Sequence, residues 1–276
     1  MRAKELFPDV FSRHARAYKR RQDALRRQGG LRARTLLIEG IGAGPGDQVL
    51  DLACGPGTLT LQLAELVAPD GQAVGIDLAP GMLEVAQASA PAGLPVRFEL
   101  MDIEDLRFPD ASFDAATCAH GLQFCADLDR ALGQARRVLR SEARFGATVP
   151  LDRSSSVGEA IVSRIAGDRL PPGPETPDRD RTRAIVSDAN AFRLHVEMAG
   201  FRNVRVQRVR ESHRWENPAE LIDMASSWWV LAERLEQLSQ PDREALLTLA
   251  RQTLEAQYGA GPIESHSTSS LLFADV

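Results

Sequence analysis

The chain has little cysteine and no long hydrophobic run. Its three cysteines, Cys54, Cys118 and Cys125, are spaced neither as a disulfide framework nor as a zinc site. We therefore expect small buried packing residues, a reducing cytoplasm and no bound metal. No apolar stretch approaches the roughly 20 residues that a membrane-spanning helix needs, and the first residues lack the apolar core of a secretory signal. The expected protein is cytoplasmic and has no membrane span.

The charge is spread unevenly along an otherwise ordinary globular composition. Residues 1–34 carry eleven Arg and Lys against three acids, so this segment is at +8 while the whole chain is at −5. A basic arm of this kind could meet nucleic acid, a membrane surface or an acidic substrate. Apolar residues recur in it at near-helical spacing, which favours a solvated face of an amphipathic helix. Nucleic acid is therefore not an expected partner.

Strand-like and helix-like segments alternate through the middle of the chain. Alternation of this kind predicts a parallel sheet with helices on both faces, whose ligands bind beyond the carboxyl ends of the strands. The expected strands are 47–52, 72–77, 96–101, 113–118 and 144–150, with helices at 57–67, 80–89 and 127–139.

Four regions follow from this pattern. Residues 1–44 are expected to form an N-terminal helical cap, with helices at 8–28 and 31–43, and residues 45–150 form the sheet core. Residues 151–186 are rich in proline, serine and charge, which indicates a mobile lid or a linker. Residues 187–276 are expected to complete the sheet, with a helix at 187–199, strands at 203–212 and 267–276, and a helical insertion at 217–258 between those strands.

Residues 49–58, Val-Leu-Asp-Leu-Ala-Cys-Gly-Pro-Gly-Thr, read as a buried strand, a turn and a helix start. Gly55 and Gly57 would let a ligand come close to the backbone. The dinucleotide-binding fingerprint needs a third glycine where this chain has Thr60, and Asp51 would repel a pyrophosphate. The turn therefore favours a ligand with a cationic or donor centre over one held by phosphates.

This segment resembles the first motif of the class I S-adenosylmethionine (SAM) methyltransferases. Residues 74–83, 98–106 and 113–122 resemble the next three strand motifs of that family in order and spacing. The similarity covers 45–150 and is greatest to the branch with quinone-biosynthesis and secondary-metabolite enzymes. It implies an α/β fold with a Rossmann-like, doubly wound, seven-stranded sheet, its last strand antiparallel, with N-terminal helices and a helical insertion before that strand. It also implies SAM as cofactor and S-adenosylhomocysteine (SAH) as product.

The resemblance assigns roles along the cofactor. Asp51 would lie next to the α-ammonium group, Asp77 would accept the ribose hydroxyls, and Asp102 would accept from the adenine amine. Met82 and Ile103 would flank the adenine. The full expected cofactor set is Asp51, Ala53, Gly55, Gly57, Thr58, Asp77, Leu78, Met82, Asp102, Ile103, Ala119 and Tyr18.

The acceptor side is less explicit in the sequence. His120 follows the fourth strand, where the substrate mouth should lie, and imidazole titrates near neutral pH, so it is the candidate general base. Packing alone is an equal alternative for this residue. Gln123 is expected to orient the acceptor. Trp228 and Trp229 would line an acceptor pocket or, equally, form the core of the insertion.

The expected function is in-line transfer of a methyl group from SAM to an oxygen or carbon of a small apolar metabolite. The fourth strand is followed by Ala119-His120-Gly121-Leu122 rather than Asn-Pro-Pro-Tyr, so an amine acceptor is less expected. One alternative is a SAM-binding protein that assists a biosynthetic rearrangement without methylating. An NAD-dependent oxidoreductase is disfavoured by Asp51 and Thr60. The expected partner is a small-molecule acceptor, and a homodimer remains open.

Overall fold

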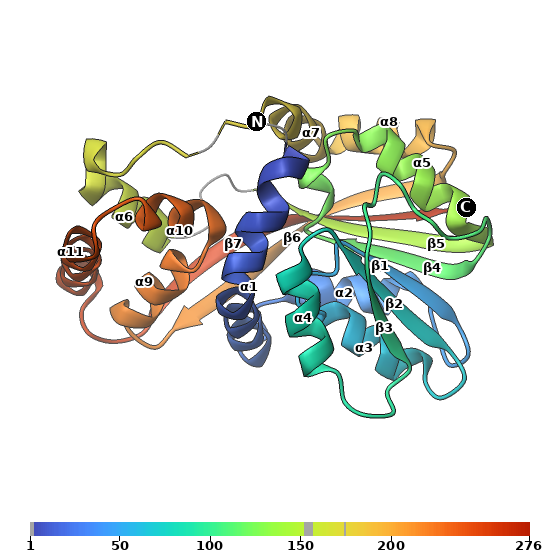
Figure 1. The fold of residues 1–276 in the computed structure, drawn as a ribbon, viewed down its shortest axis with the longest axis horizontal. Helices are drawn as coiled ribbons and strands as arrows, with labels where there is room; N and C mark the ends of the chain where they lie inside the picture. The colour runs from blue at the N-terminus through green and yellow to red at the C-terminus, as the bar shows by residue number, and fades with distance from the viewer. Residues whose placement is uncertain (1–2, 152–156, 174) are drawn as a thin grey trace.

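The computed structural model describes residues 3–151, 157–173 and 175–276. One seven-stranded sheet in the order β3-β2-β1-β4-β5-β7-β6 organises them (Figure 1). The pairs among β1 to β5 are parallel, whereas β7 runs antiparallel to both β5 and β6, as expected. The strands are β1 Gln48–Leu52, β2 Gln72–Asp77, β3 Val96–Leu100, β4 Phe113–Ala119, β5 Leu139–Pro150, β6 Arg202–Trp215 and β7 Ile263–Asp275.

The central strands are apolar because helices cover both of their faces. Neighbouring residues of β1 point to opposite sides, so Val49 and Leu50 enter separate cores. Val49 packs with Leu37 of α2 and Leu63 of α3, and Leu50 belongs to the core that contains Leu132 of α5. The helices that build these layers are α2 Arg32–Ile41, α3 Thr58–Val67, α4 Pro80–Ser89, α5 Leu128–Val138 and α8 Ala189–Met198.

Residues 151–186 contain more regular structure than the sequence predicted. Their described part includes α6 Val157–Ala166 and most of α7 Pro177–Ser187, so it is largely helical rather than irregular. The helix expected at 187–199 is confirmed as α8, which follows the end of α7 at Ser187. The Asp188 carboxylate accepts hydrogen bonds from the first backbone N–H groups of that helix and so caps it.

The insertion expected at 217–258 is helical, with α9 Pro218–Ser226, α10 Trp229–Glu236 and α11 Gln240–Tyr258. Asn217 caps the first of these helices through the N–H of Glu220, and Pro218 occupies its first turn, as the sequence predicted. Helix α6 packs against this group, and together they form a second apolar core that includes Leu221, Leu235 and Leu254. Flanking strands are longer than expected, since β6 continues to Trp215 and β7 begins at Ile263.

Helix α1, Ala3–Arg27, lies between the sheet and the insertion (Figure 1). Its buried apolar side includes Phe7, Val10 and Ala15, which confirms the amphipathic pattern. On another side, Arg13 pairs with Glu233 and Glu236 of α10. His14 joins the same two carboxylates in a group with the spacing of a metal site, but Arg13 already neutralises them, so an ion-pair network is the simpler account.

None of the described helices combines the length and the apolarity that a membrane crossing requires.

Candidate cofactor and acceptor site

A cavity lies at the carboxyl ends of β1, β2 and β4, where the sequence predicted a single site. Residues from α1 complete its wall. Most of the predicted residues line it: Tyr18, Asp51, Ala53, Gly55, Asp77, Leu78, Met82, Asp102, Ile103, Ala119, His120, Gln123 and Trp228. The wall does not include Gly57 or Thr58, and the side chain of Trp229 lies outside the described residues.

Asp51 is a deeply buried carboxylate in this wall, with a side-chain environment that the sequence did not reveal. The residue is 2% exposed. Its two oxygens accept hydrogen bonds from the hydroxyls of Thr60 at 2.6 Å and Thr117 at 2.9 Å. Burial raises its pKa to about 6, and the two hydroxyls oppose that rise. In the sequence, Thr60 only marked the absence of a third glycine. In the structure, its hydroxyl donates a hydrogen bond to Asp51.

Asp77 fixes the glycine turn from the neighbouring strand. Its carboxylate accepts the N–H of Gly55 at 2.8 Å and the N–H of Ala79 at 2.9 Å. Burial raises the pKa of Asp77, and these backbone donors counter the effect. Neither Asp51 nor Asp77 makes an ion pair with any described residue. Two carboxylates that face one cavity and form no ion pair with a described residue suit a ligand with an ammonium group and hydroxyls, as in SAM.

Gly57 has a different reason to be glycine from the one predicted. Its φ is 77°, and a Cβ there would lie 2.9 Å from the ring of Phe98 and 3.0 Å from the Cβ of Ala86. The residue therefore allows the turn to pack against β3 and α4 at the start of α3. Of the two glycines, only Gly55 lines the cavity.

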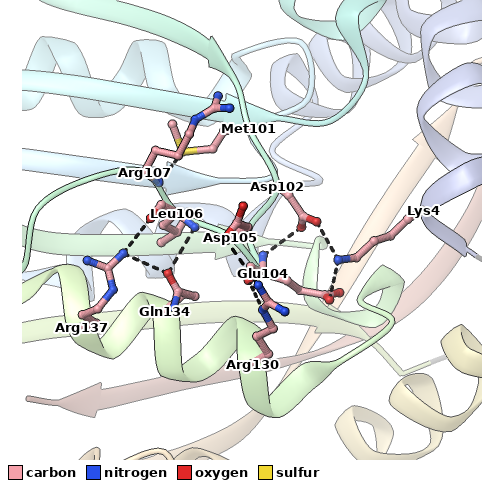
Figure 2. A network of polar contacts seen from close by, with 10 residues as sticks. All are labelled: Lys4, Met101, Asp102, Glu104, Asp105, Leu106, Arg107, Arg130, Gln134 and Arg137. Carbon is pink, nitrogen blue, oxygen red and sulfur yellow. Dashed lines mark hydrogen bonds and ion pairs between the residues drawn. The ribbon is translucent and has the colours of Figure 1, made fainter.

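The loop after β3 is tied to α1 by Lys4 (Figure 2). The Lys4 ammonium lies 2.6 Å from a carboxylate oxygen of Asp102 and 2.6 Å from one of Glu104. The other oxygen of Asp102 accepts the N–H of Glu104. Glu104 also accepts the N–H groups of Ala126 and Asp127, so this buried carboxylate joins three segments. An adenine amine would share Asp102 with Lys4, a contact that no sequence motif indicated.

Aromatic residues of α1 complete the wall above the acceptor end. Phe7 and Phe11 meet the ring of Phe124 edge-on, at centroid distances of 4.9 and 5.2 Å. Tyr18 stacks on Trp228 of the insertion at 6.3 Å. Helical spacing predicted an apolar side of this helix, but the sequence did not show that this side faces the cavity. The wall residues that sequence reasoning missed are Lys4, Phe7, Pro8, Phe11, Gln22, Arg34, Cys54, Leu59, Ala79, Met101, Glu104, Gly121, Phe124 and Cys125.

His120 directly follows β4 and has a φ of 60°, a left-handed conformation that is uncommon for residues other than glycine. Its Nε2 lies 3.3 Å from the Ser269 hydroxyl, which donates to Glu211 at 3.1 Å. Burial, and next the positive charges of Arg34, Arg21 and Arg183, lower the pKa of His120 to about 3. The imidazole is therefore neutral at physiological pH and a weak base, which argues against the predicted base role.

Gln123 supports this turn from a short helix at Leu122–Phe124. Its amide nitrogen donates to the His120 carbonyl at 2.7 Å. The amide oxygen is buried and has no partner among the described residues. Because Gln123 lines the cavity, this oxygen is available to a ligand.

A second, larger cavity of about 600 Å³ adjoins the first. Its wall includes residues of α1, α2, α7 and the β6–β7 hairpin. The residues common to both walls are Tyr18, Gln22, Arg34, His120, Gln123, Phe124 and Trp228. The two cavities therefore meet at this shared wall, which includes His120.

Comparison with known proteins identifies the central part of the chain. Residues 49–142 match the family described as a methyltransferase domain. The chain is 42% identical over 104 residues to a demethylmenaquinone methyltransferase of Symbiobacterium thermophilum, covering 37% of this chain and 41% of that protein. It is 41% identical over 112 residues to a 2-phytyl-1,4-naphtoquinone methyltransferase of Trichormus variabilis, covering 40% and 49%. The chain thus spans less than half of these relatives.

Solved structures resemble the fold over a greater length. YcgJ of Bacillus subtilis has a TM-score of 0.55 and 22% identity, over 88% of this chain and 97% of its own. The [4+2]-cyclase SpnF has a TM-score of 0.55 and 22% identity, over 88% and 79%. These likenesses concern the fold alone, which agrees with the predicted sheet order. The sequence matches thus place the likeness to methyltransferase domains in residues 49–142, and the solved structures share the fold over most of the chain.

Proposed function

We propose that the protein transfers the methyl group of SAM to an oxygen or carbon of a small molecule held in the second cavity. The observation that carries this proposal is the junction of the two cavities at His120. The first has carboxylates suited to the cofactor, and the second has room for an acceptor beside it. A methyl group that points toward this junction would meet an acceptor from the opposite side.

The residues of the first cavity suit successive parts of the cofactor. Asp51 would pair with its ammonium group and Asp77 with its ribose hydroxyls, while Met82 and Ile103 pack against the adenine. When bound, SAM supplies a methyl group that its sulfonium already activates. The protein's task is then to hold the acceptor in line and to exclude water.

His120 and Gln123 are the groups that we assign to acceptor positioning. The neutral imidazole offers a hydrogen bond, and the unpartnered amide oxygen of Gln123 offers an acceptor. Because His120 is a weak base, we infer that the acceptor ionises readily and needs no strong base. The nearby rings of Phe124 and Trp228 favour an acceptor with an apolar or aromatic part. The quinone substrates in the names of the relatives are compatible with such a part.

The direct test has two steps. Calorimetry first measures binding of SAM and SAH, and an assay for SAH release then follows turnover with candidate phenols, quinols and carbonyl compounds. The proposal expects cofactor binding and acceptor-dependent SAH formation. Tight SAM binding with no turnover by any acceptor, but conversion of a substrate by rearrangement, would instead support the non-methylating alternative. Absence of SAM binding would overturn both.

A further inference from the structure

The second cavity contains two guanidinium groups that lack carboxylate partners. The Nε and Nη1 atoms of Arg21 and the Nε atom of Arg34 are buried and make no hydrogen bond within the described part of the chain. Among the ion pairs between described residues, none includes Arg21 or Arg34. Arg21 belongs to α1 and Arg34 to α2, and both line this cavity. Buried cations without partners are costly, so folded proteins rarely keep two together.

Other contacts hold these groups without neutralising them. The guanidinium of Arg21 lies 4.4 Å from the centre of the Trp228 ring, which orients it by a cation–π contact. Burial lowers the pKa of Arg21, and the charge of Arg34 adds to that effect although Tyr18 and Glu159 oppose it. Both arginines also lower the pKa of His120, so they act on the point where the two cavities meet.

The carboxylate at the base of this cavity is already engaged. One oxygen of Glu211 accepts the N–H of Ala33 at 3.0 Å, and the other accepts the Ser269 hydroxyl at 3.1 Å. Glu159 and Asp180 also lie in the wall, and the charge of Glu159 acts on Arg21, but neither carboxylate comes within ion-pair distance of Arg21 or Arg34. His213 adds a buried Nδ1 without a partner, and burial lowers its pKa to about 4, so it is neutral. Among the described residues of this wall, no carboxylate forms an ion pair with Arg21 or Arg34.

We propose, on the basis of the function proposed above, that the acceptor carries a carboxylate and that Arg21 and Arg34 bind it in the second cavity. A carboxylate matches the planar donor fork of a guanidinium and accepts two hydrogen bonds at once. The Trp228 ring lies directly beside Arg21, so an aromatic body attached to the carboxylate has an apolar surface within reach. The acceptor is then an aromatic carboxylic acid rather than a wholly apolar molecule.

The test compares charged and neutral probes of the same shape. Calorimetry on protein saturated with SAH measures binding of benzoate against benzamide, and of 2-naphthoate against 2-naphthamide. The wild type is expected to bind at least one carboxylate about tenfold more tightly than its amide, since hydrogen bonds to charged groups are the stronger ones. Arg21→Gln should abolish this preference and leave SAH binding unchanged, because Arg21 does not line the first cavity.

Arg26→Gln is the matched control, since Arg26 is an exposed arginine of the same helix. It should keep the preference for carboxylates. Equal affinities of acids and amides for the wild type would overturn the inference whether or not Arg21→Gln folds, and so would a preference that survives in a folded Arg21→Gln. Failure to bind SAH in the first titration would count against the proposed function instead, so the two failures are distinguishable.

Discussion

Folding disfavours the charged form of Asp51, which is the form that would pair with an ammonium ligand. Its folded pKa of about 6 lies above the ordinary value of 3.8, so the folded protein holds this proton more tightly than the unfolded chain does. With respect to this group, stability is greatest at low pH and falls as the pH rises between these two values. Above about pH 6 the penalty is complete and amounts to ~3 kcal/mol. An ammonium ligand would offset this penalty by pairing with the carboxylate.

Asp51→Asn should therefore stabilise the protein and weaken its binding site. At neutral pH we expect the free energy of unfolding in urea to rise by ~1–3 kcal/mol. Affinity for SAH should fall about tenfold or more, because an amide cannot pair with an ammonium group. Urea titration and calorimetry on the same preparation measure the two effects. A less stable variant with unchanged SAH affinity would contradict the assignment.

The same carboxylate predicts a pH dependence of cofactor binding. Between about pH 7 and about pH 5, Asp51 of the free protein gains a proton, and SAH affinity should fall about tenfold. The Asp51→Asn variant should lack this change over the same interval. Calorimetry at several pH values gives both curves. Parallel curves for the two proteins would assign the dependence to another group.

His120→Gln should slow turnover and leave cofactor binding intact. Loss of the imidazole removes a positioning contact at the junction, so we expect kcat to fall about tenfold or more with SAH affinity nearly unchanged. Because the pKa of His120 is about 3, the pH–rate profile around neutrality should keep its shape in the variant. If the wild-type rate instead changes with pH near 6.5, and this change is lost in His120→Gln, His120 acts as a general base.

Helix α1 is the element that connects the sheet to the insertion over the site. Lys4 holds its beginning to the loop after β3, and Tyr18 stacks on Trp228 further along. In the middle, the Ser12 hydroxyl accepts the N–H of Gly81 at 3.1 Å, at the start of α4. These contacts are spread along the helix from its beginning to Tyr18, so the whole of this part of α1 is held against the first cavity.

Gly81→Ala should weaken the packing of α1 against the start of α4. A Cβ at residue 81 would lie 2.7 Å from the Ser12 carbonyl oxygen and 2.8 Å from its Cα, which are backbone atoms with little freedom to shift. We expect a loss of ~1–3 kcal/mol in stability, weaker SAH binding and faster hydrogen exchange in α1. Gly133→Ala in α5 is the control, since nothing lies within 4 Å of its Cβ position and alanine favours a helix. Equal behaviour of both variants would show that α1 does not need this contact.

Across the whole molecule, local patterns predicted the elements that contain strong motifs. The strand and turn at 49–58 predicted β1, α3 and the position of Asp51, because apolar runs and glycines act over short distances. The same sequence did not show that Thr60 and Thr117 hold Asp51, since those contacts depend on how β1, α3 and β4 pack. The sequence also did not show which residues of the basic arm are exposed to solvent. Arg21 and Arg34 face a cavity, although charge and periodicity predicted a solvated helix face.

The walls of the two cavities come from different parts of the chain. Residues 49–142, the matched methyltransferase region, supply most of the first wall, including its four carboxylates Asp51, Asp77, Asp102 and Glu104. Of the described residues that line the second, only His120, Gln123 and Phe124 belong to that region. Under the proposed function, the region that resembles the quinone methyltransferases would hold the methyl donor, and the acceptor would be chosen by α1, α2, α7 and the β6–β7 hairpin.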